Sequence, residues 1–206
     1  MKHMNTMIEI MNRRYACKLY APKAVEQEKL HLILEAGRLS PTSFGFEPWE
    51  FHIVQDSAKR KQLSAACFDQ ESVATAPITL VLVALKEVWY EPNGEFVAQR
   101  ASRFPEPLEA FIDDYQGYYQ FLHKQGSIDH WSRSQGYIAA ANMMSTAAAG
   151  GIQSCAIEGF IEEEVLTLLQ LDPQLYTISL AITFGYPADS FRPKIREPLD
   201  SLVHYH

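Results

Sequence analysis

The stretch Ile78-Thr79-Leu80-Val81-Leu82-Val83-Ala84-Leu85 is the longest apolar run in the chain. Such a run is too short to cross a bilayer, which takes about 20 apolar residues. Its length and β-branched residues are typical of a strand that is buried in the middle of a sheet. A second strand of this kind is predicted over residues 177–184, where Gly185, Tyr186 and Pro187 end it. These two segments predict a central sheet.

Apolar residues outside these strands recur at helical spacing. Leu30, Ile33, Leu34 and Gly37 lie on one face of a helix predicted over residues 26–39, and Pro41 follows it. Shorter helices are predicted over residues 58–67 and 161–171, and residues 49–54 alternate like a strand that enters the core. The pattern therefore mixes helices with strands.

The clearest helical pattern covers residues 135–149, which are rich in alanine and methionine. The residues that recur every three or four positions are Tyr137, Ile138, Ala141, Met144 and Ala148. Small side chains allow another helix to approach closely. Two interpretations stay open: a core helix and a dimer interface.

Residues 92–130 combine many charges with seven aromatic residues, which suits a pair of helices that cover something apolar. The aromatic residues are Phe96, Phe104, Phe111, Tyr115, Tyr118, Tyr119 and Phe121. This excursion is either a helical hairpin packed on the core or a cover over a substrate site.

The chain has 206 residues, 47% of them hydrophobic and 21% charged, which is ordinary for one globular domain. We find no repeat or long linker, so residues 1–206 are expected to form a single domain. The net charge of −7 argues against nucleic acid or an anionic membrane as a partner. The first twelve residues lack the apolar segment of a signal peptide, and we expect a cytoplasmic protein.

Most familiar catalytic motifs are absent. The sequence has no Gly-x-Gly-x-x-Gly, no phosphate-binding P-loop, no His-Glu-x-x-His and no Gly-x-Ser-x-Gly. The seven histidines are not spaced as metal ligands, so no metal site is expected. Cys17, Cys67 and Cys155 lack Cys-x-x-Cys spacing and are interpreted as reduced, partly buried thiols.

Two basic clusters stand near the ends of this acidic chain. Arg13, Arg14 and Lys18 form the first, and Lys194 with Arg196 forms the second. Both could meet around one phosphate group, to which arginine offers a bidentate fork. Solvated surface charge is the alternative, and composition alone favours it.

Four sequence blocks, in this order, resemble the bacterial FMN-dependent nitroreductases. The similarity extends from about Met11 to Val203. The blocks are Arg13-Arg14-Tyr15-Ala16-Cys17-Lys18, Ser40-Pro41-Thr42-Ser43-Phe44-Gly45-Phe46-Glu47-Pro48-Trp49, Ser154-Cys155-Ala156-Ile157-Glu158-Gly159-Phe160 and Pro193-Lys194-Ile195-Arg196. Gln135 opens the long helix between the second and the third. The chain looks closest to the oxygen-insensitive NAD(P)H nitroreductases whose loop reads Gly-x-Glu-Pro-Trp.

The chain departs from the commoner family pattern at several of these positions. The usual loop has Asn and Gln where Gly45 and Glu47 stand, and Ser where Ala16 stands. Asp69 takes the place of the usual Asn.

The resemblance implies an α+β fold with a mainly antiparallel central sheet flanked by helices. It further implies an intertwined homodimer that exchanges C-terminal segments and holds FMN at its interface. Arg14, Lys194 and Arg196 would bind the FMN phosphate, with Tyr15 and Ala16 nearby. Some of these residues would reach the same flavin from different subunits.

The remaining contacts that the resemblance implies surround the flavin ring and its ribityl chain. Lys18 would lie at the pyrimidine edge of the ring, where a fixed ammonium stabilises negative charge on the reduced flavin. The turn Ile157-Glu158-Gly159 would bring backbone N–H groups to flavin N5, which glycine permits because it has no Cβ. Further contacts would come from Ser43, Gly45, Glu47, Asp69 and Gln135.

The resemblance implies ping-pong transfer of reducing equivalents from NADH or NADPH to a small-molecule acceptor, without a catalytic side chain. Nitroaromatics, quinones and related electron-poor compounds are the expected acceptors. One alternative is a flavoenzyme for another acceptor, namely a dihydropteridine, an enone or a halogenated aromatic. Another is a non-catalytic flavin-binding dimer.

Overall fold

The computed structural model describes residues 2–105 and 107–206 and places four antiparallel strands in one sheet. The strands are β1 (Trp49–Val54), β2 (Ile78–Leu85), β3 (Gln153–Ile157) and β4 (Tyr176–Gly185), and their order is β1-β2-β4-β3. All of β2 is buried, because β2 and β4 occupy the middle of the sheet. The strands predicted over residues 49–54 and 78–85 are confirmed, and the third predicted strand is one residue longer at each end.

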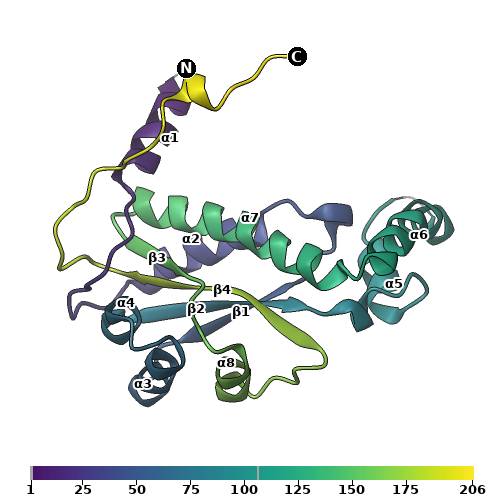
Figure 1. Cartoon of the computed structure of the whole chain (residues 1–206), viewed down its shortest axis with the longest axis horizontal. Helices are drawn as coiled ribbons and strands as arrows, with labels where there is room; N and C mark the ends of the chain where they lie inside the picture. Colours follow the sequence, from purple (N-terminus) through teal and green to yellow (C-terminus); the bar gives the residue numbers. More distant parts are fainter. Residues whose placement is uncertain (1, 106) are drawn as a thin grey trace.

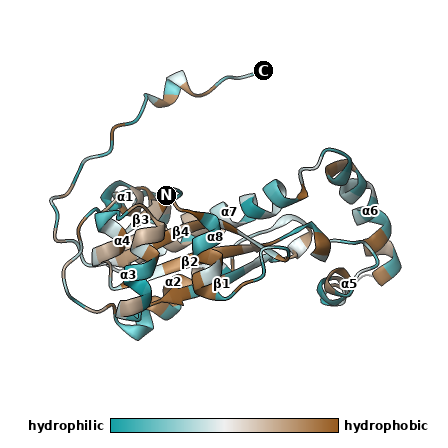
Figure 2. Cartoon of the chain, turned by 60° about the horizontal axis from the view of Figure 1, so that its bottom comes forward, coloured by the Kyte–Doolittle hydropathy of each residue, from teal (hydrophilic) through white to brown (hydrophobic). Residues whose placement is uncertain are grey.

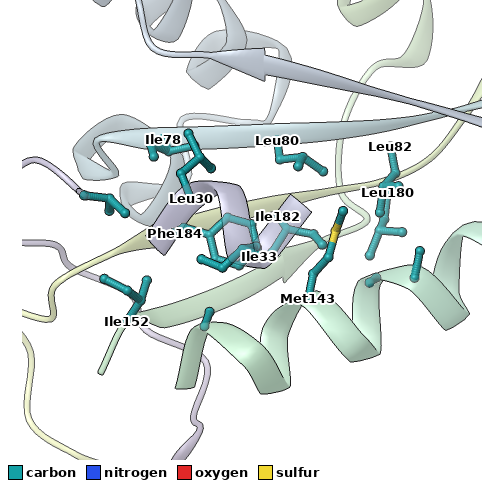
Figure 3. Packing of buried hydrophobic residues seen from close by; sticks show 14 residues of the cluster. Leu30, Ile33, Ile78, Leu80, Leu82, Met143, Ile152, Leu180, Ile182 and Phe184 are labelled. Atoms are coloured by element: carbon teal, nitrogen blue, oxygen red, sulfur yellow. The ribbon is translucent and has the colours of Figure 1, made fainter. Parts of the chain in front are cut away.

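Helices cover both faces of this sheet (Figure 1). Helices α2 (Gln27–Arg38) and α7 (Ile128–Ala149) lie on one face, while α3 (Ser57–Ala66), α4 (Glu71–Thr75) and α8 (Glu162–Leu169) lie on the other. Because side chains alternate along a strand, Leu80 and Leu82 pack toward α2 and α7, whereas Val81 and Val83 join the cluster of α3 and α8. Figure 3 shows the first of these cores, where Ile33 of α2 and Met143 of α7 meet the sheet.

The two ends of the molecule differ. At one end lies the predicted pair of helices, which is confirmed as α5 (Glu95–Ala101) and α6 (Leu108–Lys124); residues 95–124 are called the aromatic excursion. At the other end lie helix α1 (Lys2–Arg13) and the segment of residues 187–206, called the C-terminal arm (Figures 1 and 2). Within the described residues, every helix is too short or too polar to cross a bilayer.

The helix predicted over residues 135–149 exists as α7, but its first residue and its buried face differ from the prediction. It begins at Ile128 and not at Gln135, because the polar first turns are held by tertiary contacts such as the 2.8 Å hydrogen bond from the Glu87 N–H to Asp129. The buried face also differs from the predicted stripe, since Tyr137 and Ile138 are exposed. The residues that face the core are mostly small: Gln135, Gly136, Ala139, Ala140, Met143 and Ala147.

The reason for this choice of face is close packing on the sheet. A Cβ on Gly136 would lie 2.4 Å from Ser179 Oγ of β4, so only glycine lets the helix approach this closely. Of the apolar stripe that periodicity identified, Tyr137, Ile138 and Ala141 are exposed in the single chain, whereas Met144 and Ala148 pack against the core. Three further elements were not predicted: helix α1, helix α4 and strand β3.

Candidate functional site

Residues 14–18 run beside β3, the edge strand next to β4. Ala16 forms a parallel bridge with Ser154, and the Cys17 N–H donates to the Ser154 carbonyl at 3.3 Å. The Lys18 Nζ lies 3.3 Å from Cys155 Sγ. Two sequence blocks that are far apart in the chain thus lie together at one sheet edge.

Asp189, at the start of the C-terminal arm, fixes this segment. Its carboxylate accepts hydrogen bonds from the Tyr15 hydroxyl at 2.8 Å and the Lys18 N–H at 2.9 Å, and it pairs with Arg192 at 3.0 Å. Burial acts to raise the pKa of Asp189, but the Lys18 N–H and the Tyr15 hydroxyl outweigh it and hold the pKa below its usual value. Asp189 was not predicted, because it belongs to no motif.

The Cys17 thiol also donates to Asp189, at 3.3 Å. Burial, followed by this contact with the carboxylate, raises the pKa of Cys17 to about 12. A thiol with so high a pKa stays protonated at neutral pH and is a poor nucleophile. The geometry therefore supports a structural role for Cys17.

The two basic clusters meet around a cavity of about 350 Å³. Its lining residues are Arg14, Tyr15, Ala16, Arg192, Pro193, Lys194, Ile195 and Arg196. The Lys194 ammonium donates to the Arg14 carbonyl, and burial together with the charges of Arg14 and Arg196 lowers the pKa of Lys194. The cavity is strongly cationic, and none of its lining residues is acidic.

The turn after β3 contacts the segment that contains Asp69. Ile157 is buried at the end of β3, and the carbonyl of Gly159 accepts a 2.9 Å hydrogen bond from Gln70 Nε2. Asp69 itself is exposed, and its φ of 52° is left-handed. Asp69 and Gly159, both predicted site residues, are therefore brought into one neighbourhood by Gln70.

Glu158 is held from the opposite side by helix α7. The Tyr137 hydroxyl donates to Glu158 Oε1 at 2.6 Å. Burial, and then this carboxylate, raise the pKa of Tyr137 to about 12. Tyr137 was predicted only as part of the apolar stripe of a helix, and its contact with Glu158 was not predicted.

Residues 43–47, called loop 43–47, lie between α2 and β1. The Ser43 N–H donates to Gln135 Oε1 at 3.1 Å. Gln135 is buried and lies well inside the range of α7, not at its first residue. The Glu47 N–H donates to Thr42 Oγ1 at 3.1 Å, and Glu47 pairs with Arg103 of the aromatic excursion at 3.1 Å. Ser43, Gly45, Glu47 and Gln135 thus form a second group.

Left-handed backbone concentrates in these segments. Of the five non-glycine residues with positive φ in the described part of the chain, four are Phe44, Glu47, Phe68 and Asp69, and the fifth is Gln170 at the end of α8. Such conformations cost free energy and persist where surrounding contacts enforce them, often at functional sites. Their positions agree with the predicted site.

The single chain does not bring all the predicted residues together. Hydrogen bonds link Ser43 to Gln135 and Arg14 to Lys194, but among the described residues none joins one of these groups to the other. The group that contains Arg14 and Lys194 lies along β3, and the group that contains Ser43 and Gln135 lies where α7 meets loop 43–47.

Comparison with known proteins identifies the family of the chain. The family model described as "Nitroreductase family" matches residues 11–186. A Staphylococcus epidermidis protein with the provisional name NAD(P)H nitroreductase is 34% identical over 100% of this chain and 99% of its own length.

Two solved structures show the same fold. A nitroreductase-like protein from Bacillus subtilis has a TM-score of 0.86 at 22% identity and covers 99% of this chain and 100% of its own. A structure from Exiguobacterium sibiricum, solved in complex with FMN, has a TM-score of 0.80 at 18% identity, with 97% of each chain covered. The antiparallel α+β architecture, the family match and the full-length relative show that this chain belongs to the nitroreductase family.

Proposed function

We propose that the protein is an FMN-dependent oxidoreductase that passes reducing equivalents from NADH or NADPH to nitroaromatics, quinones or similar small electron-poor acceptors. The observation that carries this proposal is the cationic cavity of Arg14, Lys194 and Arg196 beside the β3 edge, where Lys18 and the 157–159 turn also lie. The FMN-bound relative and the family's NAD(P)H nitroreductase names support it.

The cavity fits a phosphate group on charge and shape. Among the described ion pairs, Arg192 is the one lining residue with a carboxylate partner, Asp189. Arg14, Lys194 and Arg196 therefore crowd positive charge, and after burial, which is the larger cause, this crowding lowers the pKa of Lys194. A phosphate dianion would relieve it, with arginine forks donating to its oxygens.

The flavin ring would extend from this phosphate along β3. Lys18 is exposed there and offers a fixed positive charge. Bound FMN would supply the two-electron chemistry by accepting reducing equivalents from the nicotinamide and passing them to the acceptor. The residues of the chain would position the rings and stabilise developing negative charge. Reductant and acceptor would share one exposed face, so the kinetics would be ping-pong.

The site would be completed in a homodimer. The C-terminal arm leaves the body of the chain, and Ile195 on it is 90% exposed (Figure 2). Helix α7 exposes Tyr137 and Ile138, and α1 exposes Met4 and Ile8. Apolar surfaces of this kind mark protein contacts. Exchange of the arms would cover them and would bring the loop 43–47 group of one subunit to the β3 edge of the other.

An absorption spectrum of the purified, FMN-reconstituted protein tests the proposal. We expect flavin bands that bleach on anaerobic addition of NADH or NADPH and return when a quinone is added. Bands that do not bleach would leave a flavin-binding protein without reductase activity. A protein that shows no bands after reconstitution would overturn the proposal.

A further inference from the structure

Arg103 joins the aromatic excursion to loop 43–47. It lies between α5 and α6, and its guanidinium donates to the Gly45 carbonyl at 2.7 Å and to Glu47 Oε2 at 3.1 Å. The Arg103 Nε also donates to the Arg100 carbonyl at 3.3 Å, within its own turn. One side chain thus links two segments that are more than fifty residues apart in the sequence.

The two segments are also complementary in shape. Gly45 has a φ of +60°, and a Cβ built on it would lie 2.6 Å from the ring of Phe104. A larger residue at position 45 would push Phe104 away, so the bare glycine allows the excursion to lie against the loop. The ring of Phe44 packs against two rings of α6: its centroid lies 6.0 Å from that of Phe111 and 5.7 Å from that of Tyr118.

Electrostatics makes Glu47 the partner that this arrangement requires. The pKa of Arg100 is lowered by its burial and then by the neighbouring charge of Arg103, while Glu47 opposes that effect. Among the residues that the structure describes, the buried Arg100 Nε has no hydrogen-bond partner. Two guanidinium groups therefore share the field of one carboxylate at the base of the excursion.

The link between Arg103 and Glu47 is suited to opening. The Arg103 and Glu47 side chains are 39% and 38% exposed, so water competes for both charges. An exposed pair of this kind contributes little to the stability of the whole fold, yet it biases the position of the turn that carries Arg103 and Phe104. Helix α6 is held separately, by hydrogen bonds from Tyr115 to the Tyr90 carbonyl and from Tyr119 to Glu91.

We propose that Arg103 is a positioning residue that latches the aromatic excursion onto loop 43–47 and thereby sets the size of acceptor that the site admits. The inference rests on the proposed function, in which loop 43–47 contacts the flavin. With the latch closed, Phe104 and Phe111 stay over the loop and small planar acceptors fit best. With the latch open, Phe104 and loop 43–47 separate, so bulky acceptors gain access and small ones lose contacts.

The first test needs no flavin and measures amide hydrogen exchange in the full-length protein. In Arg103→Gln we expect exchange of the Phe104 and Gly45 amides to become about tenfold faster, because both lie where the link is lost. Lys29→Gln is the control, since it removes a similarly exposed ion pair, the one with Glu26. Glu47→Gln should reproduce the effect, and the double variant Arg103→Gln/Glu47→Gln should add little more. Unchanged exchange in both single variants would overturn the latch.

The second test compares turnover of a small and a bulky quinone. We expect Arg103→Gln to raise KM for the small quinone and to shift the kcat/KM ratio about fivefold toward the bulky one, measured at saturating FMN. Arg103→Lys should restore part of the preference, because lysine keeps the charge but lacks the fork. Faster exchange with unchanged selectivity would overturn the proposal, whereas a wild type without flavin turnover would contradict the proposed function itself.

Discussion

The two sides of the candidate site are held by different kinds of interaction. On the β3 side, directional hydrogen bonds converge on Asp189 and fix residues 15–18. On the side of the aromatic excursion, rings pack with broad geometries around Phe44 and Phe46, and Arg103 supplies the polar link. Hydrogen bonds weaken steeply when their geometry changes, whereas ring contacts tolerate shifts. The difference suits a fixed cofactor beside an adaptable acceptor surface.

Replacing Asp189, the residue that anchors residues 15–18 beside β3, should have the largest effect on stability. Asp189→Asn leaves the Tyr15 hydroxyl and the Arg192 guanidinium without a charged acceptor, so the free energy of unfolding should fall by about 2–4 kcal/mol. Urea denaturation measures this loss. Asp200→Asn in the exposed arm is the control, and an equal effect of the two substitutions would contradict the anchor.

The same anchor predicts an acid dependence. Because the folded pKa of Asp189 lies below its usual value, its stabilising contribution is present above the unfolded pKa of about 3.9 and is lost as pH falls through the folded pKa. The difference in the free energy of unfolding between the wild type and Asp189→Asn should therefore shrink in acid. A constant difference between them down to the acid limit would count against this assignment.

Changing the adaptable side should alter selectivity and leave the cofactor in place. Phe121 is 55% exposed and stacks on Tyr118. In Phe121→Ala we expect the kcat/KM ratio between two acceptors to change about fivefold while FMN affinity stays constant, because lost ring contacts of about 1 kcal/mol affect the acceptor alone. Steady-state kinetics and a flavin titration measure the two quantities. Equal loss of both would show that the excursion is not a cover.

A smaller effect is expected where α7 holds the 157–159 turn. Tyr137→Phe removes the hydrogen bond to Glu158, which should lower stability by at most about 1 kcal/mol because Tyr137 is partly exposed. The pKa of Tyr137 is raised to about 12, so its contribution is complete below the unfolded pKa of about 10 and is lost as pH rises through 12. Thermal unfolding at neutral and alkaline pH checks this; a difference that persists above that range would contradict the sign.

Inorganic phosphate should give the smallest effect. If it binds the cationic cavity, phosphate at a concentration equal to its Kd stabilises the fold by about 0.4 kcal/mol. Thermal shifts at constant ionic strength should show this gain in the wild type and a weaker one in Lys194→Gln. A gain of the same size with chloride would indicate screening and not a site.

The sequence predicted an element correctly where its pattern of apolar residues alone determines which side chains are buried. The strand Ile78–Leu85 was predicted with its bounds, because a continuous apolar run has one plausible location in the middle of a sheet. Helix α7 was placed but began earlier and buried another face, since Gly136 allowed an approach to the sheet that no hydrophobicity pattern records.

The site divided in the same way. Arg14, Lys194 and Arg196 were predicted because the family resemblance selected them from two basic clusters, which composition alone assigned to solvated surface. The structure gathers them around one cavity. Asp189 and Arg103 were missed. Each acts through a contact with a distant segment, and such contacts leave no local pattern in the sequence.

We infer that the two ends of the chain bind the phosphate of a flavin. Titration of the protein with FMN and with riboflavin, which lacks the phosphate, tests it directly. We predict that the wild type binds FMN about a hundredfold more tightly, and that Lys194→Gln narrows this gap about tenfold while Lys61→Gln on α3 does not. Equal affinities for FMN and riboflavin in the wild type would contradict the claim.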